Sequence, residues 1–136
     1  MVDYYSLLMI ESALSLIGIV VWIFFLNHLS NTLAVISQQN RYMEPWKVWL
    51  NLVPILNFVW IFVTVHYVSN SIRLSRVRSD ADITGAETGF YGQGIAMAIF
   101  LILILIPIAG LVFWPLFIIT WALYWRNTYR FRQGEV

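Results

Sequence analysis

Long apolar stretches alternate with short polar segments along this chain, a pattern typical of helices that cross a membrane. The longest stretch, from Thr88 to Trp125, contains no charged side chain. As one helix it would measure about 57 Å, nearly twice the roughly 30 Å hydrocarbon core of a bilayer. Pro107 and Gly110 interrupt it, because proline disfavours helix at the preceding residue and glycine tolerates a turn. We expect two helices joined here in a complete hairpin; the alternatives are a re-entrant hairpin buried against protein and one long bent helix.

Two further apolar stretches precede this pair. The first, at about residues 5–26, is long enough to cross a bilayer. The second, at about 46–68, contains Pro54, where we expect a kink; a helix that began at Pro54 would keep only about 14 residues of the stretch. The predicted fold is therefore an all-α integral membrane protein, with residues 1–136 forming one domain of four transmembrane helices. The last two form a tight hairpin, and the expected spans are about 5–26, 46–68, 89–106 and 109–125.

The polar segment after the first span keeps a helical pattern. Apolar residues recur at helical spacing through residues 27–45. We therefore expect the first helix either to continue past the membrane or to lie on its surface as an amphipathic helix. The residues that carry the pattern are Leu26, Leu29, Leu33 and Ile36.

Glycine is frequent at the start of the third span. Thr84-Gly-Ala-Glu87 has the form of a capping box, which predicts a helix that begins near Gly85. Gly85-x-x-x-Gly89 has the small-residue spacing that lets helix backbones approach closely, and Gln93 lies on the same face as Gly89. The sequence therefore predicts a tight packing surface on this helix.

Composition agrees with a membrane protein. Apolar residues make up 60% of the chain, charged residues 11%, and the mean hydropathy is +0.75, whereas soluble domains have about 45–50% and about 25%. The net charge of +1 does not favour nucleic acid as a partner, and the absence of cysteine excludes disulfides and thiolate metal sites. The chain begins Met-Val-Asp-Tyr-Tyr-Ser, without the basic region of a signal peptide, so we expect the first span to be retained. We expect the lipid bilayer as partner, and no cofactor.

Basic residues are distributed unequally between the expected loops. With four spans, one side of the membrane holds six arginines, and the other holds only Arg41 and Lys47. The positive-inside rule then predicts that both termini and the loop around Ser79 face the cytoplasm, while Ser37 faces outward. The six arginines on the predicted cytoplasmic side are Arg73, Arg76, Arg78, Arg126, Arg130 and Arg132.

Glu11 is the only acid inside the first span. An ionised carboxylate in hydrocarbon costs several kcal/mol unless it is paired, hydrated or protonated. Helical spacing places Ser15, Gly18 and Trp22 on the same face, and small and polar faces mark helix contacts in membranes. We expect Glu11 to make a structural hydrogen bond with the second span at the depth of residues 64–66; the alternative is a proton or cation site.

The second span carries two polar faces. Asn57 and Thr64 share one face, whereas His66 lies on the opposite side. One face could meet Glu11, and the other must then meet the third span, the fourth span or a neighbouring chain. His66 has no second histidine or acid at the spacing of a metal site, so we expect no metal. The candidate interaction residues in the membrane are Glu11, Ser15, Asn51, Asn57, Thr64, His66 and Gln93.

Three arginines follow the second span: Arg73, Arg76 and Arg78. In one interpretation, these arginines act only as the positive charges that set the orientation of the protein in the membrane. Alternatively, each could contact anionic lipid and gain on the order of 1 kcal/mol near the membrane surface.

One stretch resembles a known class of proteins. Arg41-Tyr-Met-Glu-Pro-Trp-Lys-Val-Trp-Leu-Asn-Leu-Val-Pro-Ile-Leu-Asn-Phe-Val-Trp, followed by Ser69 and Ser71, is similar to small, uncharacterised multi-pass bacterial membrane proteins classified as a domain of unknown function. Those proteins share a Pro-Trp lead-in and then Pro-x-x-Asn with a following tryptophan inside a span. Here Glu44 precedes Pro45 and no glycine follows, which departs from their pattern. The resemblance covers residues 41–71 and implies a bacterial inner membrane and four spans, but no site.

No motif with catalytic geometry occurs, so we do not expect an enzyme. The small and polar helix faces favour a membrane scaffold or accessory subunit that packs against itself or a larger membrane complex. The alternative is a homo-oligomeric ion or proton channel, or a small transporter, whose path includes Glu11 and Asn57.

Overall fold

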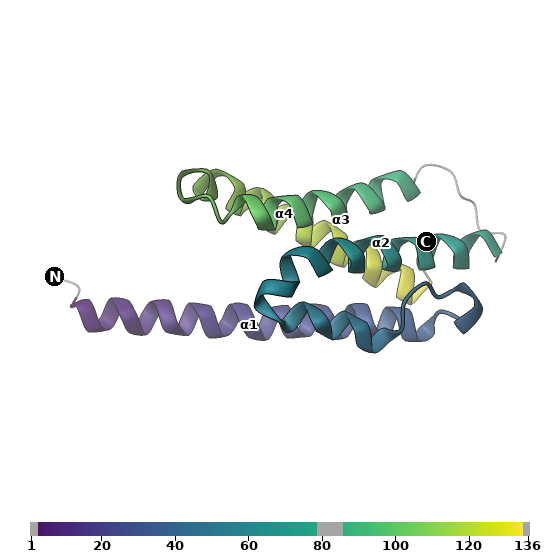
Figure 1. The fold of residues 1–136 in the computed structure, drawn as a ribbon, viewed down its shortest axis with the longest axis horizontal. Coiled ribbons are helices and arrows are strands. Elements are labelled where there is room, and N and C mark those ends of the chain that lie inside the picture. Colours follow the sequence, from purple (N-terminus) through teal and green to yellow (C-terminus); the bar gives the residue numbers. More distant parts are fainter. Residues whose placement is uncertain (1–2, 79–85, 135–136) are drawn as a thin grey trace.

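The computed structural model describes residues 3–78 and 86–134, and every element in this part of the chain is a helix (Figure 1). Two of them, the first and second α-helices, are long and apolar enough to cross a membrane, and a shorter apolar helix covers Tyr91–Leu103. The all-α expectation is confirmed. The elements are α1 (Tyr4–Val35), η1 (Gln38–Asn40), η2 (Pro45–Leu52), α2 (Pro54–Arg78), α3 (Ala86–Leu103) and α4 (Pro107–Gln133), where η denotes a 3-10 helix.

Helix α1 is continuous for 32 residues and does not end where the first apolar stretch ends. The prediction that it continues past residue 26 is confirmed. Its C-terminal half is buried in the bundle through the apolar residues that recur at helical spacing, whereas the 18-residue apolar window is 0% buried. The helix ends at Val35, and the next residue, Ile36, has an extended backbone whose N–H donates to the carbonyl of Leu33.

The expected kink at Pro54 is wrong, because α2 begins there. Proline suits the first position of a helix, where its missing N–H would have no intrahelical partner. Val53 before it is extended (φ −79°, ψ 112°), as the residue before a proline prefers. Residues 45–52 instead form the separate 3-10 helix η2. Helix α2 is nevertheless 25 residues long, because it continues to Arg78, beyond the expected end at residue 68.

Helices α3 and α4 form an antiparallel hairpin, as the Pro107–Gly110 interruption predicts (Figure 1). Ile106 is extended (φ −83°, ψ 115°), and Pro107 starts the second helix. The turn is tight, because a Cβ built on Gly110 would lie only 2.8 Å from the carbonyl oxygen of Ile104. Glycine is therefore required at this position for the turn to close against α4. The predicted cap at Thr84 lies outside the described residues.

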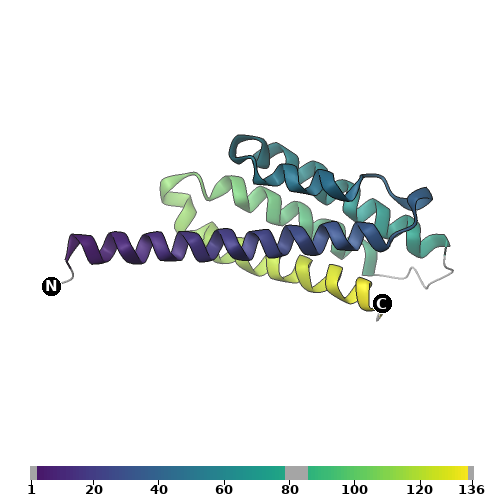
Figure 2. The ribbon, with the colours of Figure 1, turned by 90° about the horizontal axis from the view of Figure 1, so that it is seen from below.

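Helices α1 and α4 run in the same direction along the bundle (Figures 1 and 2). The rings of Trp22 and Trp121 are 6.3 Å apart, and farther along the same helices His28 Nε2 lies 3.1 Å from Thr128 Oγ1. Residue 3 and residue 134 therefore lie at opposite ends of the bundle. The prediction that both termini share one side is wrong.

The segment after α1 explains this reversal of the expected topology. The chain turns back after Val35 and returns along α1 as η2, so α2 runs in the same direction as α1 (Figures 1 and 2). Arg78 donates a hydrogen bond to Asn40 Oδ1, which places residues 36–44 beside the C-terminal end of α2. The expectation that Ser37 lies opposite the segment after the second span is therefore also wrong for residues 70–78, whereas the predicted loop around Ser79 lies outside the described residues. The expected single span at about 46–68 is divided, because residues 45–52 form the 3-10 helix that runs back along α1 and only the part from Pro54 belongs to α2.

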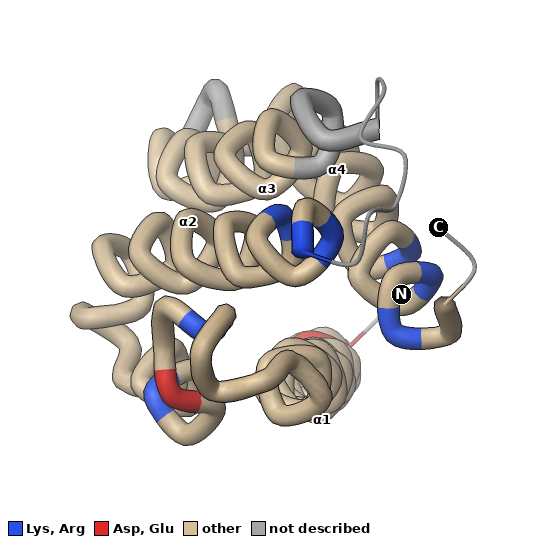
Figure 3. Tube along the Cα trace, turned by 90° about the vertical axis from the view of Figure 1, so that its right-hand side faces the viewer, with Lys and Arg blue, Asp and Glu red and all other residues tan. Residues whose placement is uncertain are grey.

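One end of the bundle collects the arginines, and we call it the basic end. It consists of residues 36–44 and the C-terminal turns of α2 and α4 (Figure 3). The opposite end, which we call the far end, holds the start of α1 and the α3–α4 turn (Figure 1). The arginines at the basic end are Arg41, Arg73, Arg76, Arg78, Arg126, Arg130 and Arg132.

Candidate functional site

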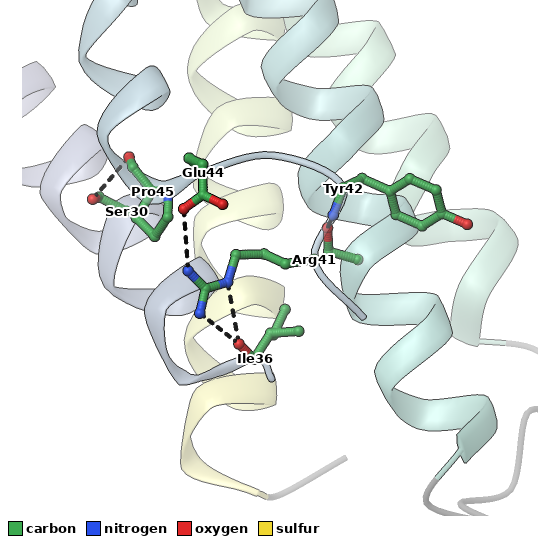
Figure 4. Close-up of polar contacts among 7 residues, drawn as sticks. Ser30, Ile36, Arg41, Tyr42, Glu44 and Pro45 are labelled. Carbon is green, nitrogen blue, oxygen red and sulfur yellow. Dashed lines mark hydrogen bonds and ion pairs between the residues drawn. The ribbon is translucent and has the colours of Figure 1, made fainter. Parts of the chain in front are cut away.

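The return segment at the basic end is fixed by a set of hydrogen bonds (Figure 4). Arg41 donates from Nε and Nη2 to the carbonyl oxygen of Ile36, at 3.2 and 3.0 Å, and its Nη1 lies 3.6 Å from Glu44 Oε2. Ser30 Oγ donates to the carbonyl oxygen of Pro45 at 3.0 Å. These contacts hold the extended loop against α1 and set the direction in which η2 leaves it.

Asn51 and Thr64 form a buried polar contact between η2 and α2. The Nδ2 group of Asn51 donates to Thr64 Oγ1 and to the carbonyl oxygen of Val48, both at 2.8 Å. Trp60 Nε1 donates to the carbonyl oxygen of Lys47 at 2.8 Å. Two side-chain donors, Asn51 Nδ2 and Trp60 Nε1, thus form hydrogen bonds across this interface, and η2 rather than α1 covers this polar face of α2.

The other polar face of α2 meets α3. His66 Nδ1 lies 3.3 Å from the Tyr91 hydroxyl, and its Nε2 lies 3.0 Å from Asn70 Nδ2. Farther along α3, Gln93 Oε1 accepts a 2.6 Å hydrogen bond from Asn127 Nδ2 of α4. The two polar faces predicted for the second span are therefore present, and both are used inside one chain.

The predicted contact between Glu11 and α2 is wrong. Glu11 and Ser15 are exposed on α1, and among the described residues Glu11 makes no hydrogen bond or ion pair. Paired residues on α1 and α4, such as His28 and Thr128, differ by about 100 in number. The same register places Glu11 level with about Gly110, close to the α3–α4 turn at the far end. Glu11 therefore lies beyond the depth at which α1 packs into the bundle.

Asn57, the other residue of the channel hypothesis, behaves differently from Glu11. Its Oδ1 atom is buried and has no hydrogen-bond partner in the described structure. Its backbone N–H donates to the carbonyl oxygen of Val53 at 2.8 Å. The two residues of the proposed path thus lie in different surroundings, one exposed on α1 and the other with a buried amide oxygen on α2.

His28 is a buried polar residue that the sequence reasoning missed. It is 6% exposed, and its imidazole bonds Thr128 Oγ1 between α1 and α4. The ring also lies 6.3 Å from Trp125 and 5.8 Å from Tyr129. One signal was present, because Phe25, Leu29 and Thr32 place position 28 on the apolar face that continues past residue 26.

The three arginines predicted to contact lipid do not share one environment. Arg73 is exposed, whereas Arg76 Cζ lies 5.5 Å from the centre of the Phe131 ring. Arg78 donates to Asn40, as described above. Two of the three therefore take part in contacts within the bundle.

Potential metal ligands do not cluster in residues 3–78 and 86–134. Within these ranges no group of three or more His, Cys, Asp or Glu side chains could hold a metal ion. The polar side chains of the interior instead join helices in pairs. No protein-family model matches this chain, and comparison with curated proteins and with solved structures finds no match.

Proposed function

We propose that the protein is a multi-pass scaffold or accessory subunit of the bacterial inner membrane. In this proposal α1, α2, α3 and α4 cross the bilayer, and η2 enters it from the basic end and returns as α2. The positive-inside rule assigns the basic end to the cytoplasm and the start of α1 to the outer face. This orientation differs from the one that the sequence predicted, because the arginines of the return segment and of the helix ends lie together.

The observation that carries the proposal is the uncovered N-terminal half of α1. Its 18-residue window has a mean hydropathy of 2.3 and is 0% buried. Exposed apolar area costs roughly 25 cal/mol per Å² in water, so a bare helix of this kind requires lipid or protein around it. Membrane insertion accounts for the apolar surface, and a partner accounts for its polar stripe.

That stripe contains Glu11, Ser15 and Gly18. A Cβ built on Gly18 would meet nothing within 4 Å, so the backbone is open to close approach there. Small residues beside polar ones are typical of helix contacts in membranes. We propose this face of α1 as the surface that packs against a second copy or a larger membrane complex.

The scaffold proposal fits the interior better than the channel alternative does. A pore requires a continuous polar path. In the described interior Asn51 bonds Thr64, His28 bonds Thr128 and Gln93 bonds Asn127, so these polar groups serve contacts between helices. Glu11 is exposed on α1 and the amide oxygen of Asn57 is buried on α2, so these two residues do not form part of a continuous polar path.

Site-specific photo-crosslinking tests this proposal. A photoreactive residue at Leu14, which is 64% exposed and lies one turn from both Glu11 and Gly18 beside the stripe of α1, should give a discrete protein adduct in native membranes. The matched control is Ile55 at the start of α2, which is 88% exposed and lies off the proposed surface, so it should crosslink only to lipid. Equal adducts at both positions, or none at Leu14, would contradict the proposal.

Flux measurements separate the scaffold from the channel. Purified protein in liposomes should pass no more protons or monovalent ions than empty vesicles. Reproducible flux that Glu11→Gln abolishes, with folding intact, would favour the channel instead.

A further inference from the structure

The uncharged stretches of α2 and α4 have the same length, and each ends at an arginine. Helix α2 has 19 residues without a formal charge before Arg73, and α4 has 19 before Arg126. At about 1.5 Å per residue each stretch measures about 28 Å, close to the roughly 30 Å of a bilayer core. Both helices therefore reach their first arginine after about one membrane thickness.

Contacts between α2 and α4 fix the relative depth of these arginines. Ser69 Oγ lies 3.5 Å from the Tyr124 hydroxyl, and Arg76 packs on the ring of Phe131. The partners in both pairs differ by 55 in number. The same register places Arg73 level with about residue 128 of α4, halfway between Arg126 and Arg130.

The resulting band of arginines is narrow. Arg126 and Arg130 are about 6 Å apart along the α4 axis, with Arg73 between them in depth. A polar headgroup layer is about 5–7 Å thick on each side of a bilayer. Figure 3 shows the arginine positions of the two helix ends near each other on the same end of the bundle. By this register, the backbone positions of the three arginines fall within about the thickness of one headgroup layer.

These three arginines are available to an external anion. Arg73, Arg126 and Arg130 are exposed, and the ion pair within the described residues joins Arg41 to Glu44 instead. The other acids with described side chains are Asp3, just before α1, and Glu11, in the N-terminal half of α1. Among the described side chains, no carboxylate forms an ion pair with Arg73, Arg126 or Arg130.

We propose that the C-terminal turns of α2 and α4 form a binding surface for anionic phospholipid headgroups, with Arg73, Arg126 and Arg130 as the phosphate ligands. Guanidinium groups match phosphate oxygens in charge and bidentate geometry. The set differs from the sequence prediction, because Arg76 and Arg78 contact Phe131 and Asn40 and two arginines of α4 join Arg73. The inference rests on the proposed membrane location.

The test measures lipid preference with the full chain in detergent. Native mass spectrometry with added phosphatidylglycerol or phosphatidylcholine should show that wild type binds the anionic lipid more tightly. Each Arg→Gln change at the three positions should lower that affinity about fivefold, and the triple variant up to about a hundredfold. Arg→Lys at one position should restore part of the loss, because the charge remains. Lys47→Gln is the control, since Lys47 is a cation on η2.

The outcomes are distinct. Equal binding of both lipids by wild type, or equal losses in the Lys47→Gln and Arg73→Gln variants, would overturn the lipid surface. If the triple variant does not fold, the three single variants give the same comparison. A protein that fractionates away from membranes would instead refute the proposed function, whereas a membrane-inserted protein without lipid preference refutes only this inference.

Discussion

Replacing Gly94 with alanine tests the packing of three helices at once. A Cβ built on Gly94 of α3 would collide with Val65 Cγ1 of α2 and would lie 2.8 Å from Tyr124 Cε2 of α4. Val65 and Tyr124 are both 0% exposed, so neither side chain can move into open space. Gly92, two residues earlier on the same helix, has nothing within 4 Å of a Cβ built in the same way.

The two glycines allow the packing cost to be separated from helix propensity. Alanine favours an α-helix over glycine by about 1 kcal/mol at either position. Overpacking a dense core costs about 1–3 kcal/mol. We therefore expect Gly92→Ala to raise the free energy of unfolding by up to about 1 kcal/mol, and Gly94→Ala to lie about 1–3 kcal/mol below it.

Reversible unfolding in detergent, followed by circular dichroism, measures this difference. Adding Val65→Ala removes the methyl group that the new Cβ meets, so Val65→Ala should cost less in the Gly94→Ala background than in wild type. A coupling of about 0.5–3 kcal/mol is the expected range for residues in contact. If Gly94→Ala and Gly92→Ala stabilise equally, or if the double variant is additive, the close approach of α3 to α2 and α4 is refuted.

Three further predictions concern topology and polar contacts. Since the chain has no cysteine, Ser6→Cys should react with an impermeant thiol reagent in intact cells, whereas Ser37→Cys should not; the reverse pattern would contradict the orientation proposed above. Asn51→Ala should lower the free energy of unfolding by about 1–2 kcal/mol. Thr64→Val should lower this free energy less in the Asn51→Ala background than in wild type, and additive losses in the double variant would disprove the contact. Glu11→Leu and Glu11→Gln should each change the free energy of unfolding of the isolated chain by less than about 0.5 kcal/mol, because the carboxylate has no partner among the described residues.

Polar side chains show why the candidate site could be predicted only in part. Helical spacing alone gives the two polar faces of α2, because it fixes the angle between Thr64 and His66. The spacing does not identify the partner of either face. Asn51 of η2 covers the Thr64 face because the chain turns back after α1, and that return depends on bonds such as Arg41 to the carbonyl of Ile36.

The sequence by itself determined the helical class, the α3–α4 hairpin at Pro107 and the continuation of α1 past residue 26. Each follows from local rules, in which apolar spacing, proline and glycine act within one or two turns. Only the tertiary structure decided the direction of the helices, the start of α2 at Pro54 and the isolation of Glu11. These features depend on the packing of η2 back along α1, which brings together residues that are distant in the chain. Counting charges across the expected spans could not include this packing, and it therefore assigned Ser37 to the wrong end.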